Sequence, residues 1–146
     1  MIQLIFWIAF IFFMSSANGY VSHKESIGFQ HFLSGIGFLN PLLHNLNITD
    51  PDFFIRKNAH AFEYIILSLL ICTIVKNYKR KPLDRIAYTL FPCLLLAVLD
   101  EFHQSFVPGR GSLISDVLID FCAAILGMLM FTLCSLIKAS KITKHK

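Results

Sequence analysis

The chain has 146 residues, of which 55% are hydrophobic and 15% are charged, and its mean hydropathy is +0.64. This composition excludes an ordinary soluble domain and predicts a single domain whose solvent is lipid. The net charge of +4 does not indicate a nucleic-acid partner, because the basic residues form short clusters beside apolar segments, which is the pattern of a membrane protein.

The first apolar segment, residues 1–17, predicts a short transmembrane helix. Its end, Ser15-x-Ala17, also fits a signal-peptide cleavage site, so a cleaved leader is the alternative. Signal peptides begin with a positively charged stretch, whereas no Lys or Arg precedes Lys24, and a retained helix is therefore favoured. The following extracytoplasmic loop, residues 19–55, contains two apolar stretches that are expected to lie along the membrane surface.

Three longer apolar segments follow, and a helix-start signal at residues 49–52 precedes the first of them. Proline and glycine at residues 108–111 predict a tight turn between the last two. We therefore expect an all-α, polytopic membrane protein with four transmembrane helices. The three longer helices are predicted over residues 58–75, 86–106 and 113–137.

Lys and Arg are distributed unequally between the two predicted sides of the membrane. The loop between the second and third helices and the C-terminal tail together carry nine, against four in the other two loops. Because positively charged loops stay in the cytoplasm, this bias predicts that the N- and C-termini are both cytoplasmic. The single domain is expected to cover residues 1–146, with a frayed basic tail over 138–146. The nine basic residues are Lys76, Lys79, Arg80, Lys81, Arg85, Lys138, Lys141, Lys144 and Lys146.

Ionisable and polar residues occur near one end of each longer helix. An acid at mid-membrane costs about 3 kcal/mol on insertion scales, so their presence is informative. At 100° per residue, each helix can turn these side chains toward a common centre, which the predicted orientation places in the outer leaflet. The residues are Lys57, His60, Glu63 and Tyr64 of the second helix, Asp100, Glu101, His103 and Gln104 of the third, and Arg110, Asp116 and Asp120 at the start of the fourth.

These residues suit either chemistry or ligand binding. The alternative is structural: Arg56 and Lys57 would anchor a helix at the interface, and Asp116 would complement a helix dipole. The candidates for acid–base catalysis are His60, Glu63, Asp100, Glu101 and Asp116. The candidates for ligand binding are Lys57, His60, Tyr64, Gln104, Arg110, Asp116 and Asp120.

Five carboxylates in this region face three basic residues, Arg56, Lys57 and Arg110. Protonation, a bound divalent cation or a water-filled pocket would relieve the excess of negative charge. Apart from this divalent cation, the sequence identifies no cofactor. The small residues Ala123 and Gly127 continue the polar face of the fourth helix and predict a close helix approach. The four cysteines lie in apolar segments and are expected to pack as small apolar residues.

The strings RKNAHAFEY, LDEFHQSFVPGR and SDVLIDFCAAILG resemble the VanZ-like membrane proteins, a family named for a teicoplanin-resistance protein. FFMSSANGYVSHKES resembles the family's serine-containing end of the first helix. The resemblance implies a multi-pass protein of the bacterial plasma membrane with a link to glycopeptide tolerance. Many relatives carry Asn where this chain has Asp120. The family pattern falls on Lys57, His60, Glu63 or Tyr64, Asp100, Glu101, Gln104, Pro108, Arg110, Asp116, Asp120 and Gly127.

Three functions are compatible with this reading. The first is a non-enzymatic envelope protein, partnered by the lipid bilayer and by an envelope lipid head group or glycopeptide-related ligand. The second is a membrane enzyme that acts on an envelope lipid or cell-wall substrate through carboxylate and His acid–base or metal chemistry. No GxSxG or HExxH motif supports a particular reaction. The third is a small cation-coupled transporter, which would require oligomers.

Overall fold

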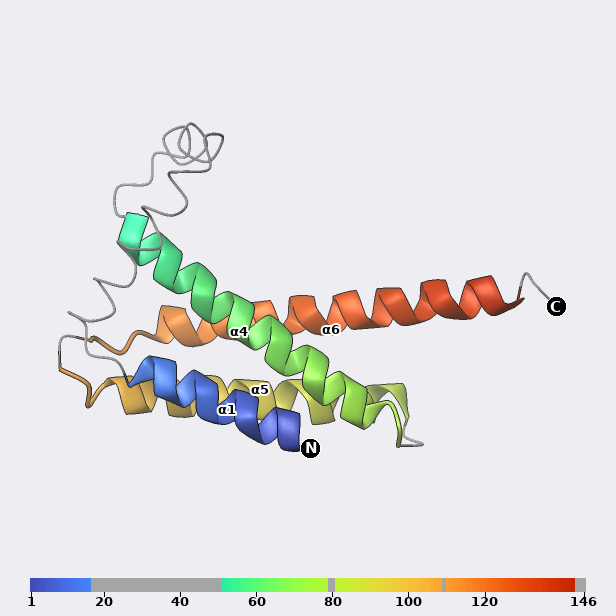
Figure 1. Ribbon diagram of the computed structural model, residues 1–146, viewed down its shortest axis with the longest axis horizontal. Helices are drawn as coiled ribbons and strands as arrows, with labels where there is room; N and C mark the ends of the chain where they lie inside the picture. Colours follow the sequence, from blue (N-terminus) through green and yellow to red (C-terminus); the bar gives the residue numbers. More distant parts are fainter. Residues whose placement is uncertain (17–50, 79–80, 109, 144–146) are drawn as a thin grey trace.

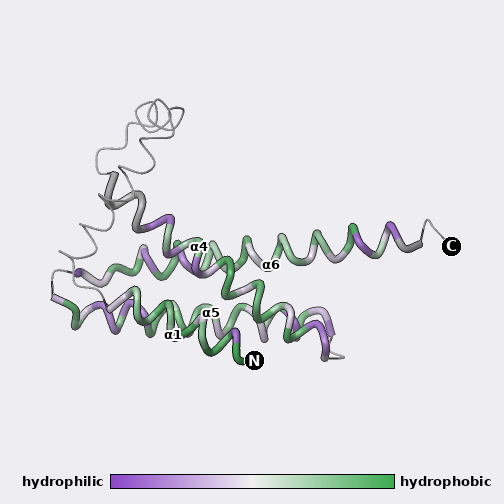
Figure 2. The backbone as a smooth tube through the Cα atoms, in the orientation of Figure 1, coloured by the Kyte–Doolittle hydropathy of each residue, from purple (hydrophilic) through white to green (hydrophobic). Residues whose placement is uncertain are grey.

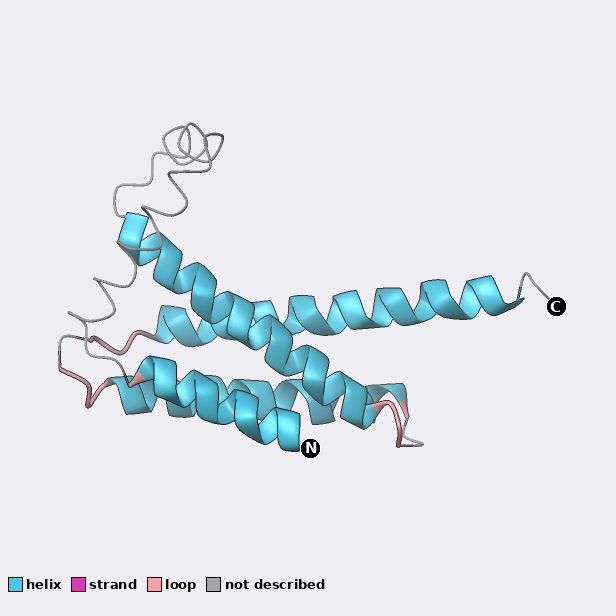
Figure 3. Ribbon diagram, viewed as in Figure 1, coloured by secondary structure: helices cyan, strands magenta, loops and turns pink. Residues whose placement is uncertain are grey.

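The computed structural model describes residues 1–16, 51–78, 81–108 and 110–143. Every regular element in these ranges is a helix, as Figure 3 shows, so the predicted all-α fold is confirmed. Most of the predicted loop over 19–55, including its two apolar stretches, lies outside the described residues. The helices are α1 (Ile2–Ser15), α4 (Pro51–Val75), α5 (Pro82–Gln104) and α6 (Ile114–Thr143).

Two of the longer helices begin earlier than predicted. Helix α4 begins at Pro51 rather than at residue 58, so the helix-start signal at residues 49–52 marks the true boundary. Helix α5 begins at Pro82 rather than at 86. A proline is favourable at the first helical position, and Asp84 in the first turn complements the helix dipole. Hydrophobicity marks the membrane span, whereas these polar signals mark where the helix starts.

The predicted helix ends also change. Helix α5 ends at Gln104, two residues before the predicted end, and a backbone hydrogen bond of 3.1 Å from Arg110 N to Val107 O closes the turn that follows. Helix α6 continues to Thr143. The prediction of a frayed tail from residue 138 is therefore wrong for residues 138–143. Basic side chains in a last helical turn interact favourably with the helix dipole, and Lys141 occupies that position here.

Three helices are long and apolar enough to cross a membrane: Lys57–Val75, Pro82–Gln104 and Ile114–Lys141. Helix α1 is apolar but has only 14 residues, a length of about 21 Å, which is shorter than a hydrocarbon core of about 30 Å. Large apolar side chains such as Phe91, Leu126 and Leu133 are exposed along these helices. The protein is therefore a polytopic membrane protein whose outer surface faces lipid.

The helices alternate in direction along the chain (Figure 1). The N-terminus, the connection from α4 to α5 and the C-terminal end of α6 lie toward one end of the bundle, whereas the end of α1 and the start of α6 lie toward the other. Helix α1 rests on α4 and α5, and α6 packs most extensively against α4. This arrangement agrees with termini on one side of the membrane, and their cytoplasmic location stays a prediction.

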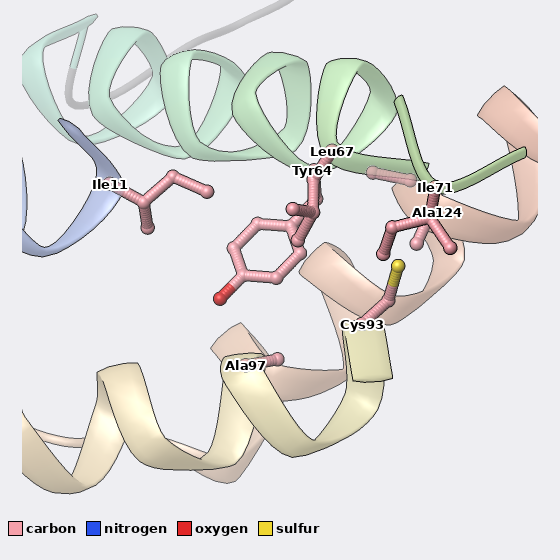
Figure 4. Close-up of a cluster of buried hydrophobic side chains, with 8 residues drawn as sticks. Ile11, Tyr64, Leu67, Ile71, Cys93, Ala97 and Ala124 are labelled. Atoms are coloured by element: carbon pink, nitrogen blue, oxygen red, sulfur yellow. The ribbon is translucent and has the colours of Figure 1, made fainter. Parts of the chain in front are cut away.

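The apolar core lies between all four helices and includes Ile11 of α1 (Figure 4). It combines Leu67 and Ile71 of α4 with the small residues Cys93, Ala97 and Ala124. Close contact depends on small residues, because lipid offers no hydrophobic drive for helices to associate. A Cβ atom at Gly127 would lie 2.7 Å from the backbone oxygen of Ile65, so the predicted close approach of α6 to its neighbour is confirmed.

Candidate functional site

One face of α4 brings four polar side chains into the bundle, three of them beyond the apolar core and the fourth, Tyr64, at its edge. Tyr64 is fully buried, Glu63 is buried and His60 is partly buried. His60 Nδ1 lies 3.3 Å from Glu63 Oε2, and the indole nitrogen of Trp7 donates a 3.0 Å hydrogen bond to the backbone oxygen of Glu63. Lys57 stands one turn earlier on the same face. The predicted polar face of this helix is therefore directed inward.

Asp100 is the central acceptor on α5. Its side chain is fully buried, and its Oδ2 atom accepts hydrogen bonds of 2.8 Å from Ser15 Oγ and 2.8 Å from Gln104 Nε2. The amide of Gln104 also donates to Ser15 Oγ over 3.2 Å. Charge-assisted bonds of this kind are about twice as strong as neutral ones. The end of α1 is therefore tied to the carboxylate through a serine.

Two residues fasten the connection between α5 and α6. The guanidinium of Arg110 donates to Gln104 Oε1 over 3.3 Å and to the backbone oxygen of Met14 over 3.5 Å. Glu101 Oε2 accepts the backbone N–H of Leu113, just before α6 begins, over 3.0 Å. Arg110 thus contacts α1 as well as α5, while Glu101 satisfies a backbone donor at the start of a helix, where acids are favoured.

Helix α6 supplies two buried acids, Asp116 and Asp120, one turn apart. Asp116 forms an ion pair with the ammonium of Lys57 and so joins the start of α6 to α4. Asp120 lies deeper and is only 3% exposed. Its electrostatic neighbours include His60, Asp100 and Glu101. The helix dipole favours an acid in the first turn, where Asp116 lies. It does not explain Asp120, which lies one turn later.

The ten predicted site residues lie together at one end of the bundle, where Figure 2 shows hydrophilic colour on α4, α5 and α6. Hydrogen bonds, ion pairs and electrostatic interactions link them across three helices and the connection that carries Arg110. Their proximity is a finding, whereas their roles stay predictions. We call this set the polar cluster: Lys57, His60, Glu63, Tyr64, Asp100, Glu101, Gln104, Arg110, Asp116 and Asp120.

Ser15 belongs at the centre of the site, although it was not among the predicted site residues. The signal was a pair of serines ending an apolar helix, which lipid does not favour unless the hydroxyls find partners. The second of the pair, Ser16, is exposed, and its Oγ atom lies 3.0 Å from His103 Nε2. His103 therefore faces α1, where its ring also meets Phe12 edge-on at 5.9 Å. It is not part of the close group formed by the other polar residues.

Negative charge exceeds positive charge in the polar cluster. Within the described side chains, five carboxylates face Lys57 and Arg110. Two cavities of about 350 and 520 Å³ lie toward the opposite end of the bundle, beside residues such as Ile71, Tyr88 and Arg85. The chemistry-bearing residues are therefore packed between helices, away from both of these cavities.

Comparison with known proteins agrees with the resemblance of the sequence motifs. Searches of curated proteins and of solved structures found no significant match. The family described as VanZ/LLP1 matches residues 1–135, a range that includes α1, α4, α5 and most of α6 together with the whole polar cluster. The match covers far more than half of the chain, and the protein belongs to the VanZ/LLP1 family.

Proposed function

We propose that this protein acts in the bacterial plasma membrane and contributes to glycopeptide tolerance of the teicoplanin type. Its polar cluster engages an envelope lipid head group or a glycopeptide-related ligand in the outer leaflet. One observation carries the proposal: Asp100, Glu101, Asp116 and Asp120 are all buried between membrane helices. Ionisable residues inside membrane bundles are costly, and by default they mark a functional site.

The orientation of the cluster follows from the charge bias of the loops. The basic connection between α4 and α5 lies toward the opposite end of the bundle from the start of α6 (Figure 1). If that connection is cytoplasmic, as the excess of Lys and Arg predicts, the polar cluster faces the outer leaflet. Envelope lipids present their cell-wall precursors, and glycopeptides arrive, on that side.

The hydrogen bonds of the cluster favour a pre-organised binding site. Asp100 Oδ2 and Glu101 Oε2 already hold Ser15 and the start of α6, and Lys57 already pairs with Asp116. These contacts fix the positions of the side chains before any ligand arrives, which lowers the entropy cost of binding. The same contacts connect α1, α4, α5 and α6 into one unit at this end.

A membrane enzyme is the second candidate, and one specific observation favours it. His60 lies beside Glu63 and within the same close group as Asp100 and Asp120. An imidazole among carboxylates is a suitable general acid or base, and such groups are often tuned by their neighbours. The substrate would be an envelope lipid or a cell-wall precursor.

Inhibitory concentrations of teicoplanin and vancomycin in a susceptible Gram-positive host test the proposal. The strains express wild type, Glu101→Gln, Asp116→Asn or the control Asp84→Asn at equal membrane levels. Asp84 lies in the first turn of α5, far along the helix from the cluster. We expect wild type and the control to raise the teicoplanin value and the two cluster variants to lose that gain.

The size of the loss separates the two candidates. Because both variants are isosteric amides, a binding site should lose activity in a graded way, whereas a catalytic carboxylate should lose all of it. A wild-type strain with unchanged inhibitory concentrations would overturn the link to glycopeptide tolerance. Equal losses in Asp84→Asn would overturn the role of the polar cluster.

A further inference from the structure

Several buried polar atoms of the polar cluster make no hydrogen bond within the described part of the chain. They are the Tyr64 hydroxyl and Asp100 Oδ1, together with His60 Nδ1 and Glu63 Oε2, which lie 3.3 Å from each other without forming a hydrogen bond. Most buried polar groups in proteins are hydrogen-bonded. Burying a polar group without a partner costs several kcal/mol, because its hydrogen bonds to water are lost and not replaced. Their concentration in one place points to a ligand that several of them share.

Three of the neighbouring side chains lie close enough together to share one metal ion. His60 of α4, Asp100 of α5 and Asp120 of α6 each offer one ligand atom, and these atoms lie within 4.8 Å of one another. Ligand atoms about 2.1 Å from a common ion lie roughly 3 to 4 Å apart, so small side-chain movements would complete the site. We propose that His60, Asp100 and Asp120 bind one divalent metal ion between the three helices.

The hydrogen bonds of Asp100 prepare this carboxylate for a cation. Its Oδ2 atom accepts from Ser15 and Gln104, which leaves Oδ1 directed elsewhere and without a hydrogen bond in the described residues. In metal sites, ligating carboxylates are commonly held by hydrogen bonds to the oxygen that does not bind the ion. Ser15 and Gln104 are thus positioning residues, and α1 contributes to the site through one of them.

Tyr64 is an independent indication of a ligand. Its side chain is fully buried, its hydroxyl has no hydrogen-bond partner in the described residues, and Asp100 and Asp120 are among its electrostatic neighbours. Figure 4 shows the hydroxyl pointing away from Cys93, toward the part of α5 beyond Ala97. A buried tyrosine hydroxyl normally finds a partner, and an ion-bound water beside the triad would supply one.

The donor set indicates the class of metal. One imidazole nitrogen and two carboxylate oxygens suit Zn²⁺ or Mn²⁺, whereas Ca²⁺ and Mg²⁺ favour oxygen ligands alone. Two aspartates also neutralise a dication, so the complete site with His60 would carry no net charge. This matters in a membrane, because the ion would reduce the excess of three carboxylates over cations in the polar cluster to one.

Metal binding to the purified, tag-free, full-length protein in detergent tests the site. Protein stripped of metal is titrated with Zn²⁺, Mn²⁺ or Mg²⁺ by calorimetry, and bound metal is counted by mass spectrometry after dialysis. We expect one Zn²⁺ or Mn²⁺ per chain and weaker binding of Mg²⁺. Asp100→Asn and Asp120→Asn should each lower the affinity by about tenfold or more.

Two histidine variants form a matched pair. We expect His60→Gln to lose affinity as the aspartate variants do, and His103→Gln to bind as wild type does, because His103 contacts Ser16 and Phe12 instead. If a ligand variant does not fold, Mn²⁺ bound to wild type still reports the site. Its spin-echo spectrum should contain nitrogen modulation from an imidazole, and that signal should persist in His103→Gln.

Three outcomes would overturn the metal site. They are the absence of saturable binding by wild type, an equal loss of affinity in His60→Gln and His103→Gln, and a loss in Glu101→Gln as large as that in Asp100→Asn. The last would show diffuse attraction of cations by the acid-rich end. Because these readouts use only metal and protein, they succeed or fail independently of the glycopeptide phenotype.

Discussion

Helix α4 packs through Leu67 and Ile71 in one half, whereas two turns earlier the same helix carries His60 and Glu63. In the apolar half the helices are held by close packing, because small residues on α5 and α6 allow the helices to meet. At the polar end the helices are joined by specific hydrogen bonds and ion pairs. A core of small apolar residues accounts for the first half by packing alone, but packing does not require five carboxylates at the other end. Packing therefore explains the apolar half, whereas the buried carboxylates of the polar end need a further explanation.

The largest expected effect is in the apolar half. Gly127→Leu should destabilise the protein by about 3 kcal/mol or more, because even a Cβ atom would lie 2.7 Å from the backbone oxygen of Ile65. The measurement is the free energy of unfolding in mixed detergent micelles. Gly111→Ala is the control, since a Cβ atom there meets nothing within 4 Å. Equal stabilities of the two variants would show that α4 and α6 are not in close contact.

The next largest effect concerns the ion pair of the polar end. Lys57→Met should cost about 3 kcal/mol, because it leaves the buried carboxylate of Asp116 without this cation. The double variant Lys57→Met/Asp116→Leu should cost less than Lys57→Met alone, since it removes the charge that was left behind. Unfolding of the single and double variants provides the thermodynamic cycle. Simple additivity would show that the two side chains do not interact.

How much of this architecture was predictable differs between the two ends. Hydrophobic runs predicted the helices, and helical spacing predicted which faces of α4, α5 and α6 point inward. Hydropathy alone misplaced the starts of α4 and α5 and the ends of α5 and α6, whereas polar signals at Pro51, Pro82 and Lys141 agree with three of these four boundaries. Long apolar segments are thus sufficient to predict that a helix forms, whereas the residues at which it begins and ends depend on single polar side chains.

The pairing of side chains could not be predicted in the same way. Ser15 and Asp100 are separated by 85 positions in the chain, and nothing in either segment specifies that they meet. The choice of neighbouring helices depends on close contacts such as that of Gly127. The spacing of apolar residues along one helix does not predict these contacts. The group of His60, Asp100 and Asp120 likewise required the placement of three helices. The sequence showed that polar faces converge, and the fold showed which atoms meet.

A smaller effect tests whether α1 belongs to the polar end. Ser15→Ala should destabilise the protein by about 2 kcal/mol, because Asp100 would lose a charge-assisted hydrogen bond in a buried setting. Ser16→Ala is the matched control on the same helix, since its exposed hydroxyl contacts the carbonyl of Phe12 and the ring of His103 but no carboxylate. We expect the control to change stability by less than about 0.5 kcal/mol. The free energy of unfolding separates them.

The smallest expected effect returns to the apolar half. Cys93 is fully buried in the core, whereas Cys134 is exposed on α6. If the cysteines are small packing residues, Cys93→Ala should cost about 1 kcal/mol by leaving a small cavity. Cys134→Ala should leave the free energy of unfolding within about 0.5 kcal/mol of wild type. Metal affinity should be unchanged in both, because neither thiol is one of the three proposed ligands, although Cys93 lies near Tyr64 in the core. A loss of affinity in Cys93→Ala would mean that the two halves are coupled, and function could then not be assigned to the polar end alone.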